Sequence, residues 1–96
     1  MKLILGGHGS GKTKRILELS AANKIPVLCE SEQRAQRLLT KAIGYGYQIP
    51  MPVVFGDENM PKEVYIDEIN TLLEVVLQCK IGALSLNSDL FETEEI

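Results

Sequence analysis

The segment from Gly6 to Thr13 has residue types and spacing that suit the binding of phosphates. It reads Gly-Gly-His-Gly-Ser-Gly-Lys-Thr and fits the pattern GxxxxGK[ST] at every fixed position. Glycines allow a tight bend and a close approach, so that several backbone N–H groups can surround a polyphosphate. Lys12 would contact the outer phosphates, and the Thr13 hydroxyl would be a magnesium ligand. We expect a nucleoside triphosphate to be bound by Gly6, Gly7, His8, Gly9, Ser10, Gly11, Lys12 and Thr13.

The role of this segment and the orientation of one of its side chains each have an alternative. A glycine-rich turn that only leads into a helix would have a similar composition. His8 occupies a variable position of the pattern, so its side chain can approach the outer phosphate or point into solvent.

The second chemical signal is the acidic pair Asp67-Glu68, which follows the apolar run Val64-Tyr-Ile. A magnesium ion in a phosphate site is usually held by one or two carboxylates together with phosphates and waters. Asp67 can therefore complete a magnesium site opposite Thr13. Glu68 can orient and deprotonate the attacking water. The alternative is an acidic pair that ends a strand by chance.

Alternating strands and helices are expected to position these residues. Apolar runs predict strands at Lys2–Gly6, Ile25–Cys29, Glu63–Asp67 and Ile81–Leu86, with a further short strand at Pro52–Phe55. Helices are expected over Lys12–Asn23, from the N-cap Ser31 to Gly44 and Gly46, and from the capping-box pattern Thr71–Glu74 onward. This order implies a parallel or mostly parallel sheet with helices on its faces, and ligands bind at the carboxyl ends of such strands.

Periodic apolar residues predict which helix faces point inward. The expected inward residues are Ile16, Leu19 and Ala22 in the first helix, Ala35, Leu38, Leu39, Ala42 and Ile43 in the second, and Leu72, Leu73, Val76 and Leu77 in the third. Cys29 and Cys79 also lie in apolar stretches, and we expect both to be buried, reduced thiols.

These residues give the chain a resemblance to P-loop NTPases of the division that places a catalytic glutamate beside the Walker B aspartate. That division holds the RecA-like ATPases, helicases, AAA ATPases and their viral relatives. The resemblance covers Walker A at 6–13, a strand at 25–29, Walker B at 64–68 and a strand at 81–86. It implies an α/β, three-layer P-loop NTPase fold with a small, mostly parallel sheet of four to five strands. It also implies a polar sensor residue after the last strand, for which Asn87 is the first candidate and Ser85 the second. A turn formed by Asn87 is the alternative.

The chain departs from that family in two respects. Residues 87–96 are too few for a further strand–helix unit, which the relatives usually have. No arginine follows the Walker B segment, so an arginine finger would have to be Arg15, Arg34 or Arg37, a partner's residue, or absent.

Composition limits the class of protein. The 96 residues predict one domain, with a loop-rich connection at 44–62 and an acidic tail at 89–96 that is either a solvated end or a contact with a partner. The net charge of −3 argues against strong independent binding to nucleic acid. Five basic residues of the first two expected helices have two possible interpretations: a local surface that binds nucleic acid, or solvated helix faces. These residues are Lys14, Arg15, Arg34, Arg37 and Lys41. No signal peptide or membrane span is expected, which predicts a cytoplasmic protein.

Together these features predict an NTPase that binds ATP, or another nucleoside triphosphate, with Mg²⁺ and hydrolyses it slowly. Lys12, Glu68 and Asn87 would be catalytic, and Thr13 and Asp67 would hold the metal. A nucleotide-dependent interaction module without turnover is the alternative from another class, and a small-molecule kinase is a further one. Small size suggests self-association or docking on a larger protein, through which nucleic acid could be reached.

Overall fold

The structure, a computed structural model, describes all 96 residues and alternates short strands with three α-helices. In chain order the elements are β1 (Lys2–Leu5), α1 (Lys12–Asn23), β2 (Val27–Cys29), α2 (Glu32–Tyr45), β3 (Val53–Val54), β4 (Tyr65–Ile66), α3 (Ile69–Leu77), the 3₁₀ turn η1 (Ser88–Leu90) and β5 (Glu92–Glu95). No helix is both long enough and apolar enough to span a membrane.

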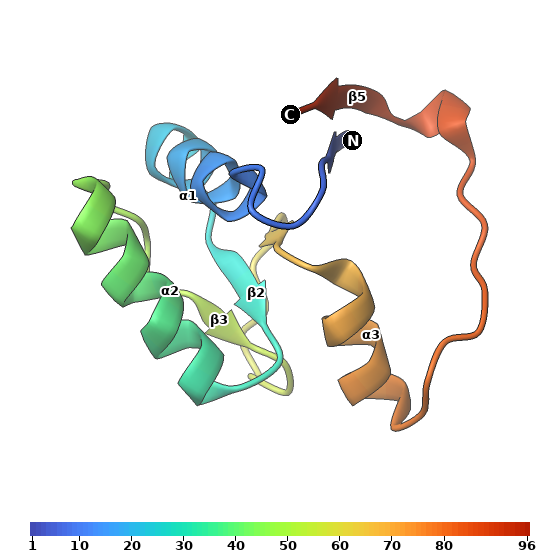
Figure 1. Cartoon of the computed structure of the whole chain (residues 1–96). Coiled ribbons are helices and arrows are strands. Elements are labelled where there is room, and N and C mark those ends of the chain that lie inside the picture. Colours follow the sequence, from blue (N-terminus) through green and yellow to red (C-terminus); the bar gives the residue numbers. More distant parts are fainter.

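All strand pairs are parallel, but they form two separate sheets (Figure 1). β1 pairs with β5, and β2 lies between β3 and β4. The protein is therefore a compact α/β protein with small parallel sheets of two and three strands. Its Cα radius of gyration is 13.4 Å, close to the value of about 13 Å expected for a compact chain of 100 residues. The expected single sheet of four to five strands is wrong in its strand count, because no strand hydrogen-bonds β1 to β4.

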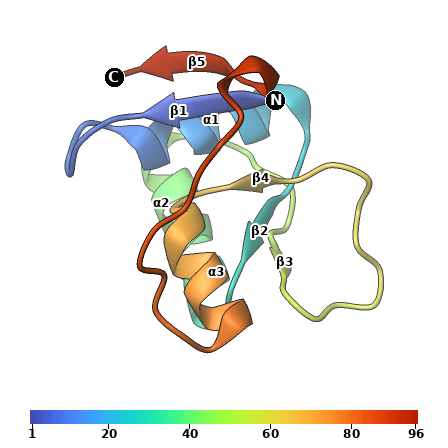
Figure 2. The ribbon, with the colours of Figure 1, turned by 90° about the vertical axis from the view of Figure 1, so that its right-hand side faces the viewer.

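The segment Ile81–Leu86, predicted as the last strand, forms no regular structure. It runs as an exposed connection past α3 to β5 in Figure 1, with Leu84 54% and Leu86 57% exposed. A strand is stable only where it finds a partner for its backbone, and the acidic segment takes that position beside β1 instead. Figure 2 shows β5 alongside β1.

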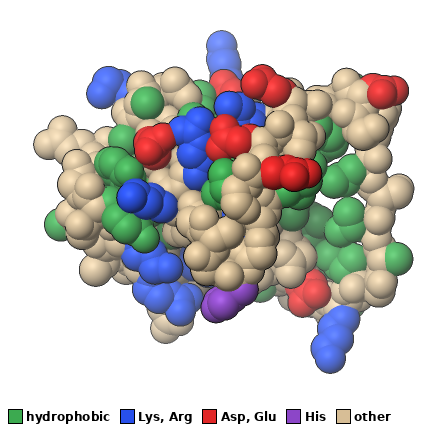
Figure 3. Space-filling model, turned by 45° about the horizontal axis from the view of Figure 1, so that its top comes forward, with side chains coloured by type: hydrophobic (Ala, Val, Ile, Leu, Met, Phe, Trp, Pro, Cys, Tyr) green, Lys and Arg blue, Asp and Glu red, His purple; other side chains and the backbone are tan.

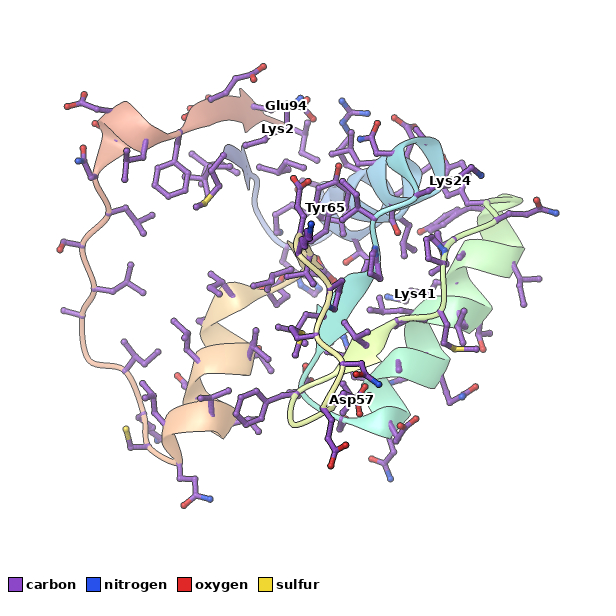
Figure 4. All side chains as sticks on the ribbon, turned by 180° about the vertical axis from the view of Figure 1, so that it is seen from behind. Lys2, Lys24, Lys41, Asp57, Tyr65 and Glu94 are labelled. Atoms are coloured by element: carbon purple, nitrogen blue, oxygen red, sulfur yellow. The ribbon has the colours of Figure 1, made fainter.

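Charge complementarity explains why an acidic segment becomes a strand. Lys2 of β1 lies 3.5 Å from Glu94 of β5, and the two side chains are neighbours in Figure 4. Arg15 of α1 donates to both carboxylate oxygens of Glu94, at 2.7 and 3.1 Å. The backbone bond from Ile96 N–H to Leu5 O (2.8 Å) continues the pairing to the end of β1. The acidic segment is thus anchored to β1 through its backbone, Glu94 and Ile96, while the Glu92 side chain stays 81% exposed.

Helix ends follow the sequence closely for α1 and α2 and less closely for α3. Ser31 caps α2 by accepting a hydrogen bond from the Arg34 N–H at 3.2 Å, and Gly46 ends it at φ 80°. Gly44 lies inside the helix. The predicted capping box at Thr71–Glu74 is wrong, because α3 already begins at Ile69 with Glu68 as its N-cap.

The core lies between α1, α2 and β2. It consists of Leu17, Val27, Cys29, Ala35, Leu38 and Ala42, each 2% exposed or less. Burial raises the pKa of the Cys29 thiol to about 11, since the thiolate would lose its hydration. Cys79 is exposed, which corrects the expectation that both thiols are buried.

The buried face of α1 is rotated from the predicted one. Leu17 and Ser20 are fully buried, whereas Ile16 and Leu19 are half-buried and Ala22 is exposed. Ser20 can occupy the interior because its hydroxyl donates to Ile25 O at 2.6 Å. In the other helices Ile43 (77% exposed) and Leu77 (57% exposed) lie outside the core, because each sits at the last turn of its helix.

Candidate phosphate and magnesium site

The loop from Gly6 to Gly11 joins the carboxyl end of β1 to the first turn of α1. Gly11 is the N-cap of α1 at φ 99°, and no side chain caps the helix. The first N–H groups of α1 therefore have no side-chain acceptor, and they carry the positive end of the helix dipole. Every residue of the loop is exposed, including His8, which is the purple residue on the surface in Figure 3. An anion can reach these N–H groups from solvent.

Glycine is required at several loop positions for different reasons. A Cβ on Gly6 would lie 2.2 Å from Ser10 Oγ and 2.8 Å from Ile96 O, so the loop closes on this residue and on the end of β5. Gly9 (φ 76°) and Gly11 (φ 99°) have left-handed backbone conformations with open space where a Cβ would stand. These positions need glycine for backbone conformation, and the open space leaves room for a ligand.

The Lys12 ammonium group lies over the loop. It donates to Gly7 O at 2.7 Å, and the Ser10 N–H donates to the same carbonyl oxygen at 3.2 Å. The side chain thus holds a positive charge above the backbone N–H groups. A phosphate oxygen in the loop would offer this ammonium a charged acceptor in place of a neutral carbonyl.

Thr13 and Asp67 are brought together, as the sequence predicted. The Thr13 hydroxyl donates to Asp67 Oδ2 at 2.9 Å, although the two residues are 54 positions apart. Asp67 directly follows β4 and is 8% exposed, whereas Thr13 lies in the first turn of α1. Because α1 packs against β4, the hydroxyl and the carboxylate meet at the base of the loop.

Arg34 is a third member of this group, and the sequence did not identify it as a partner of Asp67. Its guanidinium donates to Asp67 Oδ2 at 2.8 Å, which places it on the oxygen that also accepts from Thr13. A signal for this contact exists in the sequence. Ser31 places Arg34 in the first turn after β2, and β2 and β4 are adjacent parallel strands whose carboxyl ends coincide.

Glu68 immediately follows Asp67 and has a strained backbone, with φ 60° as the N-cap of α3. Its carbonyl oxygen accepts from the Thr71 N–H at 3.1 Å, which begins the helix. Its side chain is exposed and has no hydrogen bond or ion pair. The carboxylate is therefore available to solvent next to the buried Asp67.

Asn87 does not lie near the loop. Its side chain accepts from the Asp89 N–H at 3.1 Å and caps η1, which precedes the amino end of β5. The loop follows the carboxyl end of β1, which is parallel to β5, so Asn87 is at the opposite end of this sheet. The expected position of Asn87 at a strand end beside the phosphates is therefore wrong, because Ile81–Leu86 is not a strand. Ser85 lies in the same irregular segment.

Apart from Lys12, the basic side chains of the first two helices form two groups. Arg34, Arg37 and Lys41 of α2 line one small hollow together with Leu38. Lys14 and Arg15 of α1 have other partners. Arg15 bonds to Glu94 and Glu18, and these bonds raise the pKa of Arg15 and hold the pKa of Glu94 below its ordinary range. Lys14 lies over the Tyr45 ring at 5.4 Å. In the upper part of Figure 3, blue and red side chains lie next to one another. Arg37 and Lys41 are exposed on α2 and have no acidic partner.

The two tyrosines near the end of α2 contact each other, with ring centroids 5.8 Å apart. Tyr47 packs against the core and its hydroxyl lies 3.4 Å from Glu18 Oε2. Tyr45 is the more exposed of the two.

Comparison of the chain with protein-family models, with curated proteins and with solved structures finds no match.

Proposed function

We propose that the chain binds the phosphates of a nucleoside triphosphate, ATP or another, together with Mg²⁺, and hydrolyses it slowly. The observation that carries this proposal is the hydrogen bond between Thr13 and Asp67. It joins the two chemical signals of the sequence, the glycine loop and the acidic end of a strand, at one point. In this proposal the protein is a reduced form of the P-loop NTPase fold.

The residues of the site fit this ligand. The backbone N–H groups from Gly6 to Gly11 would surround the phosphates. The Lys12 ammonium group would give up its hydrogen bond to Gly7 O and donate to a phosphate oxygen instead. One hydroxyl and one carboxylate suit Mg²⁺, which takes its other ligands from phosphates and water. When bound, the metal would neutralise charge on the outer phosphates. Glu68 would accept the proton of the attacking water, since its carboxylate is exposed and has no other partner.

The test is to measure ATP binding and Mg²⁺-dependent ATP turnover of the full chain at rising protein concentration, with Lys12→Ala as the blank. We expect binding that Lys12→Ala abolishes and turnover that Glu68→Gln abolishes without loss of binding. If specific activity rises with concentration, a neighbouring copy completes the site. If ATP binding is absent, or is the same in Lys12→Ala, the proposal fails. Competition by GTP identifies the preferred base.

A nucleotide-dependent interaction module is the second candidate. Two observations favour it: Asn87 is far from the loop along the β1–β5 pair, and Arg15 is held by Glu94. Neither residue would then contact the phosphates. The groups that would bind the nucleotide are therefore in place, whereas two of the groups that would promote its hydrolysis are not. Lys12-dependent ATP binding with turnover at the blank level at every concentration would support this candidate. A partner protein, which could itself carry nucleic acid, would then be sought with ATP present.

A further inference from the structure

Arg34 is the one arginine with a guanidinium inside the site. Arg15 is held at β5 by Glu94. Arg37 lines the same small hollow as Arg34, but it is exposed and has no acidic partner. Arg34 bonds to Asp67 Oδ2, which also accepts the hydroxyl of Thr13. The guanidinium is therefore bonded directly to Asp67 and shares an acceptor oxygen with Thr13, and these are the two residues that would hold the metal. The side chain is 23% exposed, so its donors are partly desolvated.

We propose that Arg34 leaves Asp67 when nucleotide and metal bind, and contacts the outermost phosphate. This inference rests on the proposed function. Two cations at one carboxylate oxygen repel each other, so a metal drawn to Asp67 weakens the bond from Arg34. The released guanidinium needs an anionic acceptor, because a partly buried cation without one is unfavourable. The outermost phosphate supplies planar pairs of oxygens that match its donors.

During hydrolysis Arg34 stabilises the charge on the phosphoryl group that is transferred. The oxygen of water forms a bond to the outermost phosphorus, and the bond from phosphorus to the bridging oxygen breaks. The electron pair of that bond goes to the nucleoside diphosphate, and the proton of the water goes to Glu68. Arg34 takes no proton and acts only through its charge and hydrogen bonds.

The experiment compares Arg34→Gln with the matched control Arg37→Gln, which changes an exposed arginine one helical turn along α2. The dissociation constants for ATP and ADP are measured with Mg²⁺, since only ATP has the outermost phosphate. We expect Arg34→Gln to weaken ATP about 10- to 100-fold, as for one charge-assisted hydrogen-bonded contact, and to change ADP less than about threefold. Where wild type shows turnover, Arg34→Gln lowers it by at least the same factor. Arg37→Gln matches wild type in all three measurements.

The outcomes separate this inference from the proposed function. If wild type shows no Lys12-dependent ATP binding, both fail. If wild type binds ATP but Arg34→Gln weakens ATP and ADP by the same factor, Arg34 only positions Asp67 and the inference alone is overturned. If Arg34→Gln behaves like Arg37→Gln, it is overturned as well. Should Arg34→Gln fold poorly, Arg34→Lys keeps the charge, and we expect it to retain part of the preference for ATP over ADP.

Discussion

At the scale of single residues, Asp67 has the most demanding environment in the chain. It is one of the two buried polar residues, and its carboxylate accepts from Thr13 and Arg34 on the same oxygen. A buried charge is stable only when it is paired and hydrogen-bonded. Asp67 is therefore a structural residue as well as a candidate metal ligand.

We expect Asp67→Asn to lower the free energy of unfolding by about 2 kcal/mol, because Arg34 would be left in a partly buried position without a counter-charge. Urea denaturation followed by circular dichroism measures this change. Glu63→Gln is the control, since Glu63 is exposed and has no ion pair. Equal stability of the two variants would show that the pair with Arg34 contributes nothing to the fold.

At the scale of elements, the addition of β5 to β1 depends on charge. The hydrogen bond from Arg15 is the main cause that lowers the pKa of Glu94 below its ordinary value of 4.5. The unfolded chain lacks this partner. The stabilisation is therefore fully present above the ordinary pKa of Glu94 and is lost as the pH falls through the lower pKa of the folded state.

The corresponding prediction concerns hydrogen exchange in β5. Amide protection of β5 should be retained at neutral pH and should be lost as the pH falls through the lowered pKa of Glu94 in the folded state, where Glu94 becomes protonated while Arg15 stays charged. Glu94→Gln should show the low protection already at pH 7. Glu92→Gln should resemble wild type, because the Glu92 side chain is 81% exposed and 4.0 Å from Lys2. Full protection of β5 in Glu94→Gln would contradict this account.

The elements that the sequence predicted well are those whose signals are local. The glycine pattern predicted the start of α1, and Ser31 and Gly46 predicted the ends of α2, because caps depend on a few adjacent residues. The meeting of Thr13 and Asp67 was also predicted. It does not come from one continuous sheet, because β1 and β4 lie in separate sheets and the packing of α1 on β4 brings the two residues together. The partner of β1 was not predictable. The apolar pattern of Ile81–Leu86 favoured a strand, whereas ion pairs between distant segments placed β5 there.

At the scale of the whole molecule, few residues hold the fold together. Ten of the 96 residues are buried, and the two sheets share no backbone hydrogen bonds. A chain of this size has a thin margin of stability. The candidate site lies between the two sheets, because its loop follows β1 and Asp67 follows β4. A ligand bound there would therefore connect parts of the molecule that pair separately.

We expect Mg²⁺-ATP at 100 times the dissociation constant to add about 2.7 kcal/mol to the stability of wild type, which raises its melting temperature by roughly 10 to 20 °C. Differential scanning fluorimetry measures this shift. Lys12→Ala should melt at the same temperature with and without ATP. A shift of equal size in Lys12→Ala would mean that ATP binds elsewhere.

The bond between Lys12 and Gly7 O also has a consequence for the order of events in time. Exposed side chains change rotamer within picoseconds to nanoseconds, far faster than a ligand arrives by diffusion, so the lysine does not delay the entry of the phosphates. Arg34 is held between α2 and a buried carboxylate, and its release requires that Asp67 first acquire another cation. Capture of a nucleotide should therefore occur in two stages. The first depends on ligand concentration, and the second is a slower internal step that does not.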